Sequence, residues 1–315
     1  MSIRLSEDLQ RRLLKAKLPS LPAMAVQLLG LGQSASANVA ALTEIVSNDP
    51  AVTAALIRLA NAAAYHRIKP AETLAQATSH LGYERSRMIA MSATLLPTLR
   101  GVEGPGLCYQ EFWRRSLIAG STARAIGQQL RPDDVEPIFL AAILQDVGIL
   151  ALAQLPSAIY NGIDCSKYTH EVAIEHEREA IQEDHGAVGA WLLEQWRFPA
   201  RFVRAVRLSN TPGIVPVPTE AEDFSSLITA AGLLADLWMW AGRSHPKLIL
   251  YQSHITKLLG LDWQEVIQIL ADASSDIPLV EALCGVQIDN VKTMHMALSM
   301  LRDRGESDPS IEGDL

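Results

Sequence analysis

The chain has 315 residues, of which 49% are hydrophobic and 20% charged, and its formal net charge is −8. This composition is typical of a soluble globular protein with a large core. The negative charge and the lack of any run rich in lysine or arginine argue against nucleic acid or an anionic membrane surface as a partner. The N-terminal residues 1–17 lack the apolar core of a signal peptide, and no apolar run is expected to reach the roughly 18 residues of a membrane span.

The cysteines are Cys108, Cys165 and Cys284. They are too few and too scattered for a disulfide framework or a zinc ribbon. Such a use of cysteine indicates a reducing compartment. We therefore expect the protein to be cytoplasmic.

Helix start and stop signals recur through the first hundred residues. Asp49 and Pro50 suit an N-cap and a first helical position, Thr73 suits a second N-cap, and Gly82 suits a helix end. Apolar residues recur at helical spacing between these signals. We expect helices over residues 6–17, 23–31, 39–46, 50–65, 73–81 and 84–99, with the last one ended around Pro97.

The remainder of the chain also has the patterns of helices. Segments rich in glycine or proline, residues 100–108 and 210–219, are candidate boundaries between subdomains. No alternation of apolar and polar residues extends beyond a few positions, so the sequence predicts an all-α protein. We expect further helices over residues 110–130, 136–155, 171–184, 185–196 and 198–208, and three or four more up to residue 301.

One predicted helix, residues 136–155, is apolar on nearly every face and should lie at the centre of the fold. Its middle nevertheless carries Gln145 and Asp146. A carboxylate in such a place is costly unless it has a partner. Asp146 therefore marks either a satisfied structural contact or a functional site.

Short motifs follow one another in a fixed order along the chain. They are Leu18-Pro-Ser-Leu-Pro-Ala23, Ile45-Val-Ser-Asn-Asp-Pro-Ala51, Leu56-Ile-Arg-Leu-Ala-Asn61, the helix with Leu74, Ala77 and Leu81-Gly82, Phe112-Trp-Arg-Arg-Ser116, Ala142-Ile-Leu-Gln-Asp-Val-Gly-Ile149, His185-Gly-Ala-Val-Gly-Ala-Trp-Leu192 and Trp196-Arg-Phe-Pro199. This ordered series, over roughly residues 15–240, is similar to the HDOD domain (HD-related output domain) of bacterial signalling proteins. The resemblance implies an HD-like multi-helical bundle with an additional N-terminal helical layer, and a relationship to HD phosphohydrolases, which are metal enzymes.

The resemblance also indicates where metal ligands of the enzymatic relatives would fall. Asp146, His185 and Asp236 match ligand types. The other positions depart from the pattern: Arg115 replaces a histidine, Gln145 replaces the histidine of a His-Asp pair, and tandem histidines are replaced by Ser209 and Asn210.

This inventory predicts a degenerate site without a metal ion, catalytic residues or a cofactor. Hydrolysis of this type needs a divalent cation that activates a water molecule. A guanidinium cannot coordinate a metal, and an amide is a weak ligand. We expect Arg115 instead to pair with Asp146, Asp236 or both as a built-in cation.

Other polar and aromatic residues have structural interpretations. His185 suits a capping or hydrogen-bonding role at a helix start. His170 and His176 lie in a charged segment and are expected to be solvated. Trp238 and Trp240 cannot share one helix face, so one of them is a candidate for an exposed contact with a partner.

We expect the chain to divide into an N-terminal helical subdomain (1–100), an HD-like bundle (101–240), a C-terminal helical extension (241–304) and a disordered tail (305–315). The preferred function is a non-enzymatic signalling module that binds a protein partner. The alternatives are a phosphohydrolase or phosphodiesterase with a residual metal site, and a sensor of a nucleotide or small phosphate in which Arg115 grips the ligand.

Overall fold

The computed structural model describes residues 5–32, 38–62, 69–156, 159–210, 223–240 and 247–284. Within these ranges every regular element is a helix, so the predicted all-α fold is confirmed. The expected tail at 305–315 and the linker at 211–219 lie outside the described residues.

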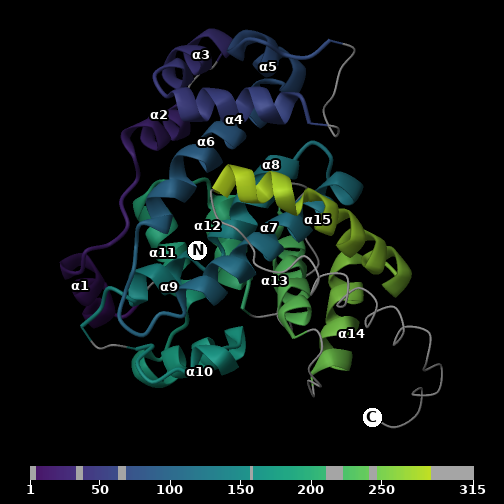
Figure 1. Cartoon of the computed structure of the whole chain (residues 1–315). Coiled ribbons are helices and arrows are strands. Elements are labelled where there is room, and N and C mark those ends of the chain that lie inside the picture. Colours follow the sequence, from purple (N-terminus) through teal and green to yellow (C-terminus); the bar gives the residue numbers. More distant parts are fainter. Residues whose placement is uncertain are drawn as a thin grey trace.

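The N-terminal helices are α1 (Glu7–Lys15), α2 (Ala23–Leu31), α3 (Val39–Ser47), α4 (Pro50–Ala60) and α5 (Leu74–Leu81). Their caps are those that the sequence predicts. The Asp49 carboxylate accepts from the backbone N–H groups of Ala51 and Val52, and Thr73 forms a capping box with Gln76. Helices α2 to α5 gather in one layer at the top of Figure 1, whereas α1 lies away from them.

Helix α6 (Tyr83–Arg100) leads from this layer into the rest of the molecule (Figure 1). The expected end at Pro97 is wrong, because the helix continues to Arg100. Pro97 is exposed and lies in the last turn of the helix, where its ring removes only one backbone hydrogen bond. Helix α4 also ends earlier than expected, at Ala60 rather than near residue 65, which lies outside the described residues.

The larger bundle consists of α7 (Tyr109–Leu130), α8 (Val135–Leu144), α9 (Val147–Leu152), α10 (His170–Ile181), α11 (His185–Gln195), α12 (Ala200–Leu208), α13 (Ser225–Met239), α14 (Leu248–Leu259) and α15 (Trp263–Cys284). Helix α7 is its axis and packs against α8, α13 and α15. The buried Arg124 of α7 joins three of these helices, because it lies 3.2 Å from Glu136 of α8 and 3.3 Å from Asp276 of α15.

The apolar segment at the centre is two helices rather than the one expected over 136–155. The chain turns at Gln145 and Asp146 between α8 and α9. Gly148 lets α9 pack closely against α11, since a Cβ there would lie 2.0 Å from the backbone oxygen of His185 in α11. The expected burial is confirmed, because every residue from Val135 to Leu152 is buried.

The same segment corrects the expectation about membrane spans. The 18 residues Val135–Leu152 have a mean hydropathy of 1.8, enough for a span by length and composition. All of them are buried inside the fold, and a core helix can have the same length and hydropathy as a membrane span.

Both tryptophans near the end of α13 are buried, so the expected exposed tryptophan is wrong. Trp238 and Trp240 are 2% and 4% exposed. Trp240 follows the last residue of α13, so its ring is not confined to a helix face, and it packs against Tyr251 of α14 at a centroid distance of 5.1 Å.

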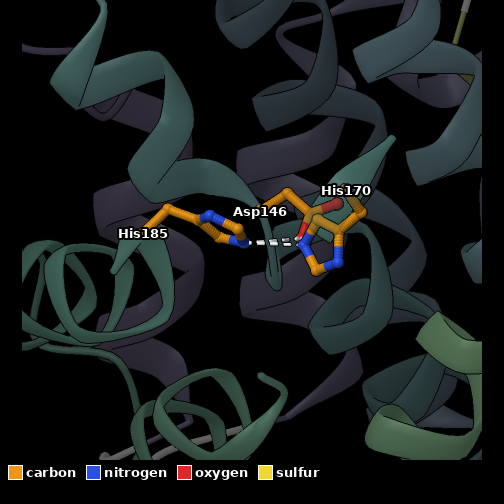
Figure 2. A group of neighbouring side chains, drawn as sticks. All are labelled: Asp146, His170 and His185. Carbon is orange, nitrogen blue, oxygen red and sulfur yellow. Dashed lines mark hydrogen bonds and ion pairs between the residues drawn. The ribbon is translucent and has the colours of Figure 1, made fainter. Parts of the chain in front are cut away.

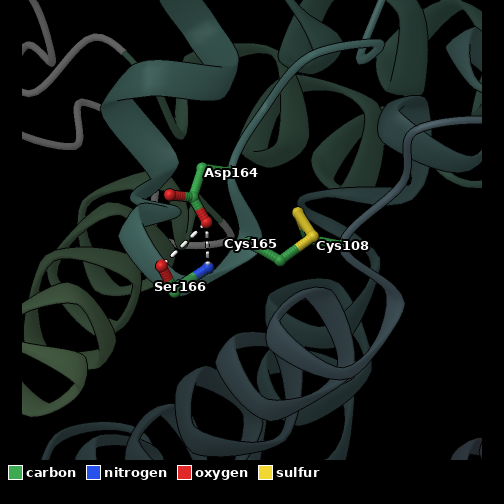
Figure 3. Close-up of a disulfide and its surroundings, with 4 residues drawn as sticks. All are labelled: Cys108, Asp164, Cys165 and Ser166. Atoms are coloured by element: carbon green, nitrogen blue, oxygen red, sulfur yellow. Dashed lines mark hydrogen bonds between the residues drawn. A yellow bond between two sulfur atoms is a disulfide. The ribbon is translucent and has the colours of Figure 1, made fainter.

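Cys108 and Cys165 form a disulfide across 57 positions of sequence (Figure 3). Cys108 is buried immediately before α7, and Cys165 is exposed in the short 3-10 helix η2 (Cys165–Lys167) before α10. The scattered spacing of the cysteines therefore misled the sequence interpretation, because folding brings distant loops together. The argument for a reducing compartment loses this support.

Candidate functional site

Three charged side chains from different parts of the bundle meet in its interior. Nε of Arg115 in α7 lies 2.7 Å from Oδ1 of Asp236 in α13, and its Nη2 lies 3.3 Å from Oδ2 of the same carboxylate. Nη1 of Arg115 donates to Oδ2 of Asp146, at the turn between α8 and α9. The predicted pairing of Arg115 with both carboxylates is confirmed.

All three groups are buried, so their charges interact in a medium of low polarity. Burial alone would raise the pKa of Asp146, but Arg115, His170 and His185 together outweigh it and hold that pKa well below its ordinary value. Burial is likewise outweighed at Asp236, where Arg115 and His170 together leave the pKa lowered. Arg115 therefore acts as a fixed cation between two ionised carboxylates.

A second cluster lies on the other side of the Asp146 carboxylate (Figure 2). Nε2 of His170 and Nε2 of His185 lie 3.5 Å and 3.4 Å from Oδ1 of Asp146. The two Nε2 atoms are 2.8 Å apart. Each histidine is the first residue of its helix, α10 or α11, so these two helix starts face the turn that carries Asp146.

The expectation that His170 is solvated is wrong, because its residue is only 6% exposed. Helix α10 buries His170, Ala173 and Glu177, which lie on one side at helical spacing. Two of these three residues are ionisable, so the buried side looks like a solvated one in the sequence. The sequence did contain one signal for this burial, because the spacing places Glu177 two turns after His170 and so on the same side of the helix. His176, on another side, is partly exposed.

Glu177 is a site residue that the sequence interpretation missed. Its carboxylate accepts from the backbone N–H of His185 at 2.7 Å and lies 2.8 Å from Nδ1 of the same residue. The hydroxyl of Tyr160 donates to it at 2.7 Å. His185 therefore hydrogen-bonds, as expected, but it does not cap α11; the Asp184 side chain does so by accepting from Ala187 N.

The other positions indicated by the resemblance divide into two groups. Asn210 belongs to the cluster, because its Nδ2 lies 2.9 Å from Nε2 of His185. Ser209 and Gln145 do not, since their side chains donate to backbone oxygens of Val206 and Ala142 at 2.8 and 2.9 Å. The structure thus brings together Arg115, Asp146, His185, Asn210 and Asp236.

Within the described part of the chain, two buried oxygen atoms of the cluster have no hydrogen-bond donor. They are Oδ1 of Asp146 and Oδ1 of Asn210. Asp146, His170 and His185 each offer a ligand atom within 4.8 Å of the others, so the residue types and spacing suit a cation. The site therefore joins an arginine held by carboxylates to a compact set of potential metal ligands.

The model of the HDOD domain family matches residues 18–212. No curated protein matches the sequence. Among solved structures, the chain is similar to an HDOD domain protein of unknown function from Geobacter sulfurreducens, with a TM-score of 0.67, 19% identity and coverage of 88% of this chain and 99% of that one.

Two further structures have similar folds. One, named a putative phosphohydrolase from Shewanella amazonensis, has a TM-score of 0.58 and 21% identity, over 95% of this chain and 99% of that one. The other, named a putative signal transduction protein from Marinobacter aquaeolei, has a TM-score of 0.59 and 18% identity, over 93% of this chain and 68% of that one. At these identities the likeness concerns the fold.

Proposed function

Because the chain belongs to the HDOD domain family, we propose that it is a signal-transduction module without hydrolase activity that acts by binding another protein. The observation that carries this proposal is the position of Arg115. Its guanidinium contacts both Asp146 and Asp236, where the enzymatic relatives place ligands of a catalytic cation. A guanidinium supplies positive charge but cannot lower the pKa of a bound water.

The burial of the site also supports a non-catalytic role. Arg115, Asp146, His170, His185 and Asp236 are all buried. A phosphate ester needs contact with both a nucleophile and a charge-stabilising group during hydrolysis. The same burial weighs against a nucleotide sensor built on Arg115, because the guanidinium already binds two carboxylates.

The partner surface that we propose is on α14. Ile249 and Leu250 are adjacent there and are 68% and 48% exposed. Neighbouring exposed apolar residues are favourable contact points for another protein. We propose the cytoplasm as the location, and there Cys108 and Cys165 would be thiols except under oxidising conditions.

Hydrolysis assays test the catalytic part of the proposal. The purified full chain is incubated with cyclic dinucleotides or guanosine tetraphosphate in the presence of Mg²⁺ or Mn²⁺. We expect no release of product above the rate without protein. Metal-dependent turnover that is abolished by Asp146→Ala would overturn the proposal.

A crosslinking experiment in the native bacterium tests the binding part. We expect the full chain to capture a specific protein, and Ile249→Asp to lose it. Val39→Asp, which changes an exposed apolar residue of α3, is the matched control and should retain the partner. Equal capture by both variants would show that α14 is not the contact surface.

A further inference from the structure

The cluster on the far side of Asp146 contains three potential ligand atoms that converge on one point (Figure 2). These are Oδ1 of Asp146 and the Nε2 atoms of His170 and His185. Oδ1 is buried and has no hydrogen-bond donor among the residues that the structure describes, although the other oxygen of the same carboxylate is bound by Arg115. A buried carboxylate oxygen without a donor is costly, so it calls for a positive group.

Each imidazole ring has a carboxylate near its other nitrogen, at hydrogen-bond distance for His185 and at ion-pair distance for His170. Nδ1 of His185 lies 2.8 Å from Glu177, and Nδ1 of His170 lies 3.6 Å from Asp236. A carboxylate at Nδ1 favours a proton there and leaves the lone pair on Nε2, which is the arrangement found behind metal-binding histidines. The two Nε2 atoms are 2.8 Å apart, where one shared proton can join them as a hydrogen bond, and a metal ion would take the place of that proton.

The buried charges are also unequal. Asp146, Asp236 and Glu177 contribute three carboxylates, whereas Arg115 contributes one guanidinium. With both imidazoles neutral, as metal binding requires, the ionised cluster has two negative charges in excess. One divalent cation would compensate them, and charges buried without compensation are strongly unfavourable.

The distances suit a small transition-metal ion. Four ligands at about 2.0–2.1 Å around tetrahedral Zn²⁺ lie about 3.3–3.4 Å from one another. The two distances from Asp146 Oδ1, 3.4 and 3.5 Å, are close to this value, and the histidine pair would open by about half an ångström. A ligand set of two imidazole nitrogens and one carboxylate oxygen favours Zn²⁺ and other late first-row transition metals over Mg²⁺ or Ca²⁺.

We propose that Asp146, His170 and His185 bind one divalent transition-metal ion, of which Zn²⁺ is the best fit. The side-chain oxygen of Asn210 is the candidate fourth ligand. It is buried without a donor from the described ranges, and rotation of the amide exchanges it with Nδ2, which lies 2.9 Å from His185 Nε2.

This ion has a structural or sensory role and goes beyond the proposed function. His170 lies outside the positions that the family resemblance indicates, and Arg115 keeps its place between Asp146 and Asp236. With every ligand residue buried or nearly so, the ion has little room for a substrate. Metal binding and hydrolysis are measured separately, so either proposal can fail alone.

Titration of the metal-stripped, tag-free full chain with Zn²⁺ and Co²⁺ tests the proposal. Calorimetry should show one ion bound per chain, and Co²⁺ should give the visible absorption bands of tetrahedral nitrogen and oxygen ligation. His170→Gln should weaken binding about 100-fold or more, because it removes one of two imidazoles. Glu177→Gln should weaken it about 10–100-fold through the loss of support behind His185.

His176→Gln is the matched control, since it changes a histidine of the same helix that points elsewhere, and its affinity should equal that of the wild type. Circular dichroism establishes that each variant is folded. Absence of saturable binding by the wild type would overturn the proposal, as would equal affinity in His170→Gln and His176→Gln. If His170→Gln does not fold, an octahedral or absent Co²⁺ signal in the wild type would overturn it independently.

Discussion

Arg115 and Asp236 are 121 positions apart in the sequence, yet Nε of Arg115 lies 2.7 Å from Oδ1 of Asp236. The contact joins α7 to α13, two helices that pack along each other in the centre of the bundle. A second contact from the same guanidinium reaches Asp146. Lysine could not reproduce both contacts, because its ammonium is a single point charge.

Removal of Arg115 should therefore strand two buried carboxylates. We expect Arg115→Ala to lower the free energy of unfolding by about 3–5 kcal/mol, as measured by chemical denaturation. Arg11→Ala, at an exposed position of α1, should change it by less than about 0.5 kcal/mol. Equal effects of the two substitutions would show that the buried pairing makes no net contribution to the free energy of unfolding.

The disulfide should stabilise the oxidised protein. A loop of this length restricts the unfolded chain by about 4 kcal/mol, so Cys108→Ser should lower the stability by roughly 2–4 kcal/mol. A phosphine or dithiol reductant, which is oxidised as the two thiols form, should produce the same loss in the wild type. Cys284→Ser should leave the response to reductant unchanged. Stability that is independent of reductant in the wild type would contradict this prediction.

Stability should also depend on pH through His185. Burial by itself would lower the pKa of His185, but the Glu177 carboxylate, with Asp146, raises it to about 10 from 6.5. Because the folded-state pKa is the higher one, the contribution is fully present below about pH 6.5 and is lost as the pH rises towards 10.

In chelator-treated protein, the free energy of unfolding should fall between these pH values more steeply for the wild type than for His185→Gln. His170 and Asp146 also face the His185 ring and contribute to the pH dependence of both proteins. The free energies of unfolding are therefore measured at one ionic strength, and the difference between wild type and His185→Gln is followed as a function of pH. Parallel curves for the two proteins would contradict the raised pKa.

Gly148 should tolerate no side chain. A Cβ at this position would lie 2.0 Å from the backbone oxygen of His185, so α9 and α11 would have to separate. We expect Gly148→Ala to cost roughly 3 kcal/mol or more in thermal or chemical unfolding. Gly101→Ala, where the nearest atom is 3.5 Å from the added Cβ, is the control and should be nearly neutral. A stable Gly148→Ala protein would show that the two helices can move apart freely.

The sequence was most informative where the signal is local. The caps at Asp49 and Thr73 follow from side chains that bond to their own helix start, and they were predicted correctly. Arg115 was also interpretable, since a permanent cation at a former ligand position needs a carboxylate. The burial of the 136–155 segment followed from its lack of a polar face.

The errors concern contacts that depend on folding. His170 is at the start of a helix rich in charge, and only the packing of α10 against the bundle reveals that this side is buried. The Cys108–Cys165 pair likewise depends on two loops that meet in space. Glu177 could have been suspected from its spacing to His170, but spacing alone does not distinguish a buried acid from a solvated one.

The disulfide also means that one cleavage of the backbone between the two cysteines would not release two free fragments. Asn161 and Gly162 are exposed and lie between the two cysteines in sequence. A protease that cleaves there would leave Arg115 and Asp146 on one fragment, and His170, His185 and Asp236 on the other. Held by the disulfide, the two fragments would migrate as one molecule on a denaturing, non-reducing gel and would separate into two bands only after reduction.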